Sequence, residues 1–254
     1  MLLAIDIGNS HIVLGVYSGD ELLASWRLQT DMRRTVDEYA LQVLALLSNA
    51  VPGGKRVLQV AVSSVVPALT GVFADLSKKY FGILPLTVSS DIKTGLVIAY
   101  DDPRSIGADR IVNAVAMKEL VGYPSVLVDF GTATTFDVLS ASGTYEGGLI
   151  APGLQISSDA LFQKASKLWT IELKTPKHLI GKNTPDSMLA GIMFGYVGLV
   201  DGIIARLKRE LGENMRVMAT GGMASMIAGQ SEHIEKVMPN LTLEGLRILA
   251  KMNS

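Results

Sequence analysis

The stretches LLAIDIGN at residues 2–9 and SVLVDFGT at residues 125–132 follow one pattern. In each, an apolar run leads to Asp-x-Gly, and small residues with hydroxyl or amide side chains follow. The pattern predicts a buried strand that ends in a tight turn and returns as a second strand. Glycine has no Cβ, so the backbone N–H groups of such a turn can reach phosphate oxygens. Two such hairpins predict a duplicated nucleotide-binding fold, which is typical of a phosphotransferase.

The composition narrows the possible classes of protein. The chain has 254 residues, 48% of them hydrophobic and 19% charged, enough apolar material for one large domain or two small ones. A formal net charge of -1 argues against a nucleic-acid partner. The absence of cysteine excludes disulfides, thiolate metal sites and a cysteine nucleophile. No signal peptide and no uninterrupted membrane span is recognisable, so we expect a cytoplasmic protein without a membrane partner.

The order of predicted elements repeats along the chain. The first half has a strand meander at 2–28, a helix from Thr35 that Pro52-Gly53-Gly54 ends, a buried strand at 57–62, a helix from Pro67 and a helix at 107–121. The second half has a meander at 126–150, a helix after Pro152-Gly153, a long helix at 187–211 and a strand at 216–219.

This repeated order predicts an α/β fold of two related halves, residues 1–121 and 122–254, with a nucleotide cleft between them. We expect the closing helix at about 243–251 to be able to cross back onto the first half. In the long helix, glycines recur every three or four residues and leave one face bare of side chains, which lets another helix or a backbone approach closely.

The two Asp-x-Gly turns supply the first candidate site residues. These are Asp6, Gly8, Asn9 and Ser10 in the first turn, and Asp129, Gly131, Thr132 and Thr134 in the second. An isolated Asp-x-Gly is usually an ordinary turn. Two matched copies at the ends of two buried strands favour the functional interpretation. The Asp6 carboxylate would lie where Mg²⁺ bridges protein and phosphate, and the hydroxyl groups would donate to phosphate oxygens.

Two further segments are candidates. Thr220-Gly221-Gly222 ends the last strand, and its flat Gly-Gly step could let a purine or ribose lie on the backbone. The segment Gly107-Ala108-Asp109-Arg110 begins a helix. There, Asp109 could simply favour the helix dipole while Arg110 faces solvent. Alternatively, Asp109 is a general base and Arg110 binds substrate or phosphate, since phosphoryl transfer to an alcohol needs both functions.

Taken together, these motifs resemble the type III pantothenate kinase family over essentially the whole chain. The resemblance is carried by DIGNS at 6–10, GADR at 107–110, DFGTATTFD at 129–137, GGLIAPG at 147–153, GKNT at 181–184 and TGG at 220–222. It implies the actin, sugar-kinase and Hsp70-like fold, which is ribonuclease H-like in each half. It also implies ATP-dependent phosphorylation of the primary hydroxyl of pantothenate to 4'-phosphopantothenate, the first step towards coenzyme A.

The resemblance also implies roles for individual residues. Asp109 would be the base, Asp6 the carboxylate associated with Mg²⁺, and Asp129 the ligand of a monovalent cation, K⁺ or NH₄⁺. The ATP site would comprise Gly8, Asn9, Ser10, Gly131, Thr132, Thr134, Thr220, Gly221 and Gly222. The pantothenate site would comprise Tyr100, Gly107, Ala108, Asp109, Arg110 and Thr184. Thr184 would come from the partner subunit of a homodimer, so that the pocket is completed across the interface.

Two other functions remain open from the sequence. The fold is shared with kinases of other small alcohols, such as sugars, and only the 107–110 segment and Thr184 argue against that substrate class. A regulatory protein that binds ATP without turning it over is the second alternative. The carboxylates distinguish it, because a pure ATP-binding protein would not need Asp109 near an acceptor.

Overall fold

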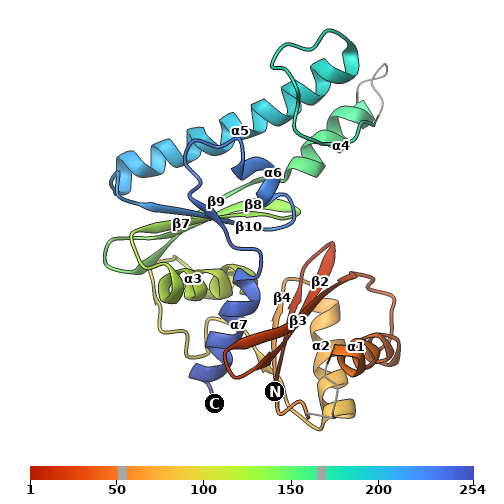
Figure 1. Cartoon of the computed structure of the whole chain (residues 1–254). Coiled ribbons are helices and arrows are strands. Elements are labelled where there is room, and N and C mark those ends of the chain that lie inside the picture. The colour runs from red at the N-terminus through yellow and green to blue at the C-terminus, as the bar shows by residue number, and fades with distance from the viewer. Residues whose placement is uncertain (51–55, 165–169) are drawn as a thin grey trace. The chain divides into compact units, whose positions relative to one another are not determined.

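The structure, a computed structural model, describes residues 1–50, 56–164 and 170–254 and divides into two compact units (Figure 1). The first unit comprises residues 1–120 and 240–254, and the second comprises residues 121–239. The closing segment therefore belongs with the N-terminal part of the chain and not with the half that precedes it. The predicted helix stop at Pro52-Gly53-Gly54 falls outside the described residues.

The first unit is built on a mixed sheet with the strand order β3-β2-β1-β4-β5. β1 and β2 are antiparallel, as are β2 and β3, whereas β1–β4 and β4–β5 are parallel pairs. The strands of this unit are β1 (Leu2–Ile7), β2 (His11–Ser18), β3 (Glu21–Gln29), β4 (Gln59–Ser64), β5 (Leu86–Thr87) and β6 (Val97–Ile98). Its helices are α1 (Val36–Ala50), α2 (Pro67–Leu76), the π-helix Ser77–Phe81, the 3₁₀-helix Pro103–Ser105, α3 (Ala108–Leu120) and α7 (Leu241–Met252).

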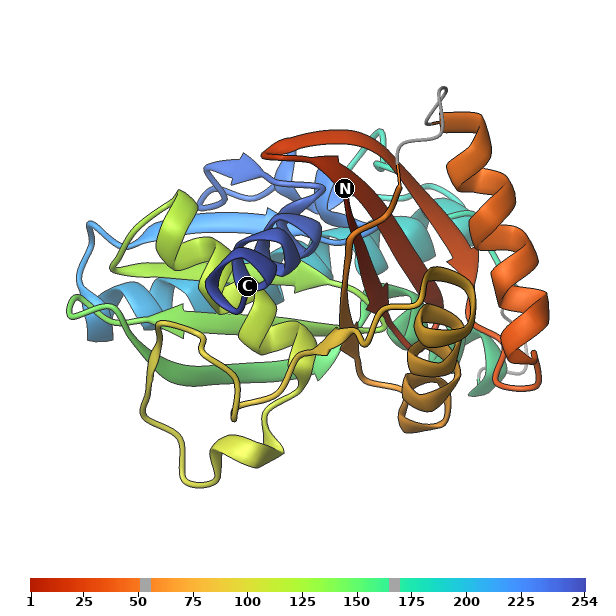
Figure 2. The ribbon, with the colours of Figure 1, turned by 90° about the horizontal axis from the view of Figure 1, so that it is seen from below.

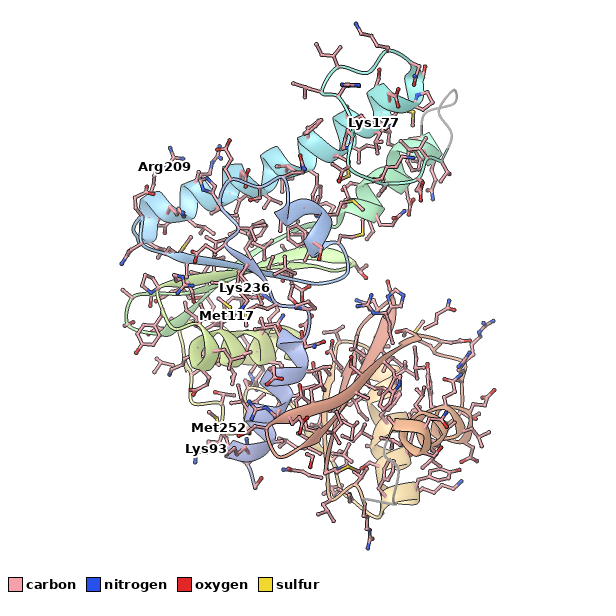
Figure 3. All side chains as sticks on the ribbon, in the orientation of Figure 1. Lys93, Met117, Lys177, Arg209, Lys236 and Met252 are labelled. Carbon is pink, nitrogen blue, oxygen red and sulfur yellow. The ribbon has the colours of Figure 1, made fainter. Side chains whose placement is uncertain are left out.

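Each face of this sheet is covered by helices, as Figure 2 shows for α1 and α2 on one side and α7 on the other. Alternate strand residues, such as Leu3, Ile5 and Ile7, enter the core under α1 and α2. The opposite face packs closely on α7, since a Cβ on Gly15 would lie 2.9 Å from Leu243. At the far end of α7, Met252 lies beside the segment of Lys93, whose backbone exchanges two hydrogen bonds with Asn253 (Figure 3).

Five strands of the second unit repeat this architecture in the order β11-β10-β7-β8-β9. β7–β8 and β8–β9 are antiparallel, and β7–β10 and β10–β11 are parallel, as in the first unit. Its strands are β7 (Ser125–Phe130), β8 (Ala133–Leu139), β9 (Thr144–Pro152), β10 (Arg216–Thr220) and β11 (Lys236–Val237). Its helices are α4 (Leu154–Lys164), α5 (Thr184–Leu211) and α6 (Ala224–Ala228). The matching strand order confirms the predicted duplication.

The long helix α5 is a core helix of the second unit. Met193, Val200 and Ile204 are fully buried against the sheet, while Arg209 lies at the C-terminal end of the helix (Figure 3). By length and composition α5 could also cross a membrane. That is weak support for a membrane protein, because the core helix of a soluble protein meets the same criteria.

Candidate active site

The first Asp-x-Gly turn connects β1 to β2. The Gly8 N–H donates a hydrogen bond to the His11 carbonyl at 3.0 Å. A Cβ on Gly8 would lie only 3.0 Å from that same oxygen, so the close turn favours glycine. Asn9 and Ser10 are exposed at the tip. The turn therefore presents backbone and side-chain donors at the end of a buried strand.

Asp6 lies directly opposite Ser63 of the parallel strand β4. Residues in register on neighbouring strands share a face of the sheet, so Ser63 is the neighbour of Asp6 on the face covered by α3 and α7. Ser63 is fully buried, and its hydroxyl has no hydrogen-bond partner among the described residues. The sequence analysis missed Ser63, because a serine at the end of a strand carries no signal of its own.

This neighbourhood fits the Mg²⁺ that the resemblance implies. In phosphate sites Mg²⁺ is bound by one or two carboxylates together with phosphate oxygens and waters. Asp6 supplies such a carboxylate, and the buried Ser63 hydroxyl beside it is a spare polar group. Within residues 1–50, 56–164 and 170–254, no three His, Cys, Asp or Glu side chains gather to bind a metal by themselves.

Asp109 lies in the first turn of α3, and its carboxylate folds back over the preceding glycine. Its Oδ1 accepts a hydrogen bond from the Arg110 N–H at 2.8 Å. A Cβ on Gly107 would lie 2.5 Å from the same oxygen, so a side chain at 107 would displace the carboxylate from this position. Burial raises the pKa of Asp109, and the hydrogen bond and charge of Arg110 oppose this shift only in part. A carboxylate with a raised pKa is a better proton acceptor near neutral pH.

The first unit contains three other residues that were predicted to bind the substrate, Tyr100, Ala108 and Arg110. Ala108 and Arg110 are buried, with Arg110 only 6% exposed. A buried arginine is unusual unless it binds a partner group. Tyr100 follows β6 and is 37% exposed, so its ring is accessible to a ligand.

The second Asp-x-Gly turn connects β7 to β8. The Gly131 N–H donates to the Ala133 carbonyl at 3.1 Å, which mirrors the first turn. Gly153 packs against this turn, since its N–H donates to the Thr132 carbonyl at 3.2 Å and a Cβ there would lie 2.3 Å from that oxygen. Gly131 and Thr132 are exposed. The turn is thus packed tightly by backbone on one side and open on the other.

Asp129 lies against the start of the Gly221-Gly222 step. Gly221 has φ +96°, and a Cβ there would lie 2.6 Å from both Asp129 Oδ1 and the Phe130 carbonyl oxygen. Two oxygens therefore converge beside a position that must be glycine. This donor set fits the K⁺ or NH₄⁺ that the resemblance implies, because hard cations favour oxygen ligands.

Two predicted phosphate or nucleotide contacts are placed differently by the structure. Thr134 is fully buried, and its hydroxyl is hydrogen-bonded to the hydroxyl of Tyr196 on the α5 side of the sheet. Thr220 does share the face of Asp129, but it is buried and its hydroxyl donates to the Met238 carbonyl at 2.8 Å. Both hydroxyl groups are therefore hydrogen-bonded within the second unit, and their predicted contacts with phosphate and adenosine stay predictions.

The strand register places a further hydroxyl residue, Thr135, beside Asp129. Thr135 pairs directly with Asp129 across β7 and β8, so the two side chains share a face. Gly222 is exposed at the end of β10. Thr184 is exposed at the first position of α5, whose N-cap is Asn183, and the Asn183 side chain accepts a hydrogen bond from the Asp186 N–H.

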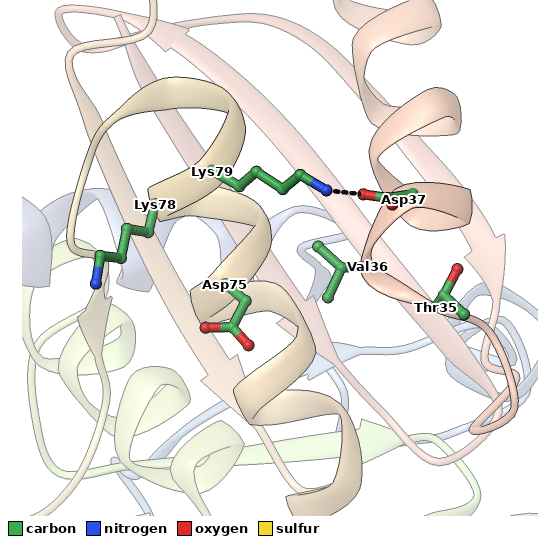
Figure 4. A pocket seen from close by; sticks show the side chains of 6 residues that line it. All are labelled: Thr35, Val36, Asp37, Asp75, Lys78 and Lys79. Atoms are coloured by element: carbon green, nitrogen blue, oxygen red, sulfur yellow. Dashed lines mark hydrogen bonds and ion pairs between the residues drawn. The ribbon is translucent and has the colours of Figure 1, made fainter.

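The first unit has one cavity beside the first turn and another on a separate part of its surface. A cavity of about 260 Å³ is lined by Asn9, Thr30, Asp31, Met32, Arg33 and Val66, and so adjoins the first turn. A wider one of about 690 Å³ is lined by Thr35, Val36, Asp37, Asp75, Lys78 and Lys79 (Figure 4). None of the predicted site residues lines the wider cavity, and its Lys79–Asp37 ion pair is solvent-exposed.

Comparison with solved structures describes the fold. A structure described as a Baf family transcriptional activator from Campylobacter jejuni is similar with a TM-score of 0.61 at 19% identity, covering 99% of this chain and 98% of the other. Component A of (R)-2-hydroxyglutaryl-CoA dehydratase from Acidaminococcus fermentans is similar with a TM-score of 0.57 at 14% identity, covering 98% and 95%. The chain therefore shares its overall fold with these two proteins.

Comparison of the sequence describes the family. The type III pantothenate kinase family model matches residues 2–206. The type III pantothenate kinase of Geotalea daltonii is 54% identical over 253 residues, which span 100% of this chain and 99% of that protein. A match of this length and identity covers both turns, the 107–110 segment and Thr184. The chain therefore belongs to the type III pantothenate kinase family.

Proposed function

We propose that this protein, acting in the cytoplasm, transfers the γ-phosphoryl group of ATP to the primary hydroxyl of pantothenate and forms 4'-phosphopantothenate. Membership of the family supports pantothenate as substrate and coenzyme A biosynthesis as the pathway. The observation that carries the finer proposal is the half-buried Asp109 carboxylate. It lies at the start of a helix beside Arg110, with its pKa raised by burial.

Asp109 acts as the general base in this proposal. Its carboxylate accepts the proton of the pantothenate hydroxyl while the hydroxyl oxygen forms a bond to the γ-phosphorus and the bond from that phosphorus to the ADP oxygen breaks. The buried guanidinium of Arg110 supplies positive charge for binding the substrate. Tyr100 and Gly107 form further parts of the pantothenate site.

The first turn binds the phosphates of ATP. The glycine at position 8 brings the backbone of Asn9 and Ser10 close to the phosphate oxygens, and Asp6 is associated with Mg²⁺ through phosphate or water. Bound Mg²⁺ would neutralise charge on the transferred group. In the second unit, Gly131 and Thr132 continue the phosphate site, and Gly221 and Gly222 face the adenosine.

Asp129 binds K⁺ or NH₄⁺ in this proposal. Support comes from the convergence of Asp129 Oδ1 and the Phe130 carbonyl beside Gly221. A monovalent ion tolerates irregular oxygen coordination, whereas Mg²⁺ requires near-ideal octahedral geometry and retains its waters. The cation would add positive charge close to the phosphates.

The active protein is a homodimer in which Thr184 of one subunit completes the pantothenate site of the other. Two features of the second unit support this. A Cβ added to Gly191, Gly195 or Gly198 of α5 would meet no atom within 4 Å, so this helix face is open. Just before Thr184, Leu179 and Ile180 are 71% and 72% exposed, which is unusual for large apolar side chains.

Light scattering tests the dimer at the protein concentration of the activity assay. A dimeric mass is expected. A monomeric mass for the fully active enzyme would contradict the proposal.

Release of ADP from ATP tests the reaction itself. The purified protein is assayed with and without pantothenate, and in potassium, ammonium and sodium salts at constant ionic strength. We expect release that requires pantothenate and is fastest in potassium or ammonium. Release that proceeds with a sugar but not with pantothenate would indicate another small-alcohol kinase. Binding of ATP with no release under any condition would indicate an ATP-binding regulatory protein.

A further inference from the structure

The turn after β1 is fastened from outside by Thr30, the residue that directly follows β3. The Thr30 hydroxyl donates a hydrogen bond to the Gly8 carbonyl at 2.7 Å, across 22 residues of sequence. The Thr30 N–H donates a second bond to the Ser10 carbonyl at 3.1 Å. Two carbonyl groups of the phosphate turn therefore point towards this one residue.

These bonds set the direction of an N–H group in the turn. A peptide unit is planar and trans, so the Gly8 carbonyl and the Asn9 N–H point in opposite directions. Because the carbonyl points to Thr30, the Asn9 N–H points to the other side of the turn. Asn9 is exposed, so a ligand can reach this residue.

Other polar groups of the same loop are engaged elsewhere. The Arg33 guanidinium, which also lines the 260 Å³ cavity beside Asn9, is bonded to the two Asp31 carboxylate oxygens at 3.0 and 3.2 Å. Its charge is therefore compensated within the loop. Among the described residues of this loop, Thr30 is the one that donates hydrogen bonds to the turn, at 2.7 and 3.1 Å.

The second unit contains half of the same arrangement. Gly153 directly follows β9, which corresponds to β3, and its N–H donates to the Thr132 carbonyl of the second turn. The backbone bond is therefore common to both units and suits a structural role. The hydroxyl bond to Gly8 is specific to the first unit, where the proposed function requires N–H groups aimed at phosphate.

We infer that Thr30 is a positioning residue for the phosphates of ATP, whose hydroxyl fixes the Gly8 carbonyl and thereby aims the Asn9 N–H at a phosphate oxygen. The inference rests on the proposed function of this turn. A net contribution typical of one neutral hydrogen bond corresponds to roughly a three- to tenfold change in affinity. Loss of the Thr30 hydroxyl should therefore weaken the binding of ATP and leave the binding of pantothenate unchanged.

Thr30→Val tests the inference, because valine has the shape of threonine and retains the backbone N–H but lacks the hydroxyl. Titration calorimetry with Mg-ATP, in the absence of pantothenate, is expected to show roughly three- to tenfold weaker binding. The KM for ATP should rise in parallel, while the KM for pantothenate stays unchanged. Thr30→Ser, which restores a hydroxyl, should restore ATP affinity.

Thr35→Val is the matched control. The Thr35 hydroxyl lies in the same connection but bonds Glu38 at the start of α1, at 2.9 Å. This variant should lower the Tm through loss of the helix cap and leave ATP affinity unchanged. Parental ATP affinity in Thr30→Val, equal weakening of ATP and pantothenate, or no recovery in Thr30→Ser would each overturn the inference. A parent protein that binds Mg-ATP but does not phosphorylate pantothenate would refute the proposed function alone.

Discussion

The two Asp-x-Gly turns occupy corresponding places in the two units but are built differently. Four residues separate the last paired residues Ile7 and Ile12 of the first hairpin, whereas three separate Phe130 and Thr134 of the second. The first turn is fastened by a side-chain hydroxyl from Thr30. The second turn is packed by the backbone of Gly153 and lies beside Gly221.

This difference suits two kinds of ligand. The longer first turn is held by the Thr30 hydroxyl, so its N–H groups have set directions that suit phosphate oxygens. A shorter turn packed against glycine backbone has little freedom, and its oxygens converge on a fixed point, as a bound cation requires. The two copies of one hairpin are thus packed differently, and under the proposed function the first would bind phosphate and the second would also bind a cation. Variants of each turn and its surroundings test whether the two turns bind different ligands.

The largest effect is expected from removing the proposed base of the first unit. Asp109→Asn keeps the shape of the side chain but cannot accept a proton, so turnover should fall about a hundred- to ten-thousandfold. Binding of ATP and pantothenate, measured by calorimetry, should persist. Turnover close to that of the parent would mean that Asp109 is not the general base and that the first unit does not supply it.

The next largest effect is expected at the second turn. Asp129→Ala removes the proposed cation ligand and should lower turnover about a hundredfold, as loss of a preorganised electrostatic group does. The stimulation by potassium or ammonium over sodium should vanish with it. Rates are compared in the three salts at constant ionic strength. Equal rates for the parent in all three salts would mean that the second turn has no cation role.

A stability measurement tests how tightly the second turn is packed. Gly153→Ala would place a Cβ 2.3 Å from the Thr132 carbonyl oxygen, so the backbone must shift. We expect the free energy of unfolding to fall by about 3 kcal/mol, the upper end for overpacking. Gly71→Ala is the control, because nothing lies within 4 Å of its Cβ and it should stabilise α2 by about 0.5–1 kcal/mol. Similar Tm values for both variants would contradict the packing argument.

The smallest effect concerns pH. Because burial raises the pKa of Asp109, the acidic limb of the rate profile should lie above the ordinary range of an aspartate carboxyl. The raised pKa also means that ionised Asp109 disfavours folding. This cost is absent below the ordinary pKa and complete above the raised one. Asp109→Asn should therefore unfold at a slightly higher temperature than the parent at neutral pH, and at an equal one in acid.

Much of this arrangement could be predicted from the sequence because its signals are local. Each Asp-x-Gly turn follows its own apolar strand, and the 107–110 segment begins its own helix. Residue roles that depend on strand register could not be predicted. Thr134 and Thr135 are neighbours with the same hydroxyl, and only the pairing of Asp129 with Thr135 shows which of them shares the Asp129 face.

Contacts between residues far apart in the sequence could not be predicted either. Thr30 acts on a turn 22 residues away, and Gly153 and Gly221 reach the second turn from separate strands. Nothing at these positions distinguishes them from ordinary turn residues until the strands are paired. The hydrogen bond from the Thr220 hydroxyl to the Met238 carbonyl is another long-range contact of this kind. It forms because β11, which Met238 follows, pairs with β10.

The return of α7 to the first unit affects how the chain is made. This helix covers one face of the N-terminal sheet, where the Tyr17 hydroxyl donates to Glu244 and the Gln59 amide donates to the Ala250 carbonyl. The ribosome must therefore synthesise residues 121–239 after the N-terminal segment of the first unit and before its final helix. At typical elongation rates this takes roughly 6 to 24 s. During that interval the nascent sheet lacks the helix that covers one of its faces.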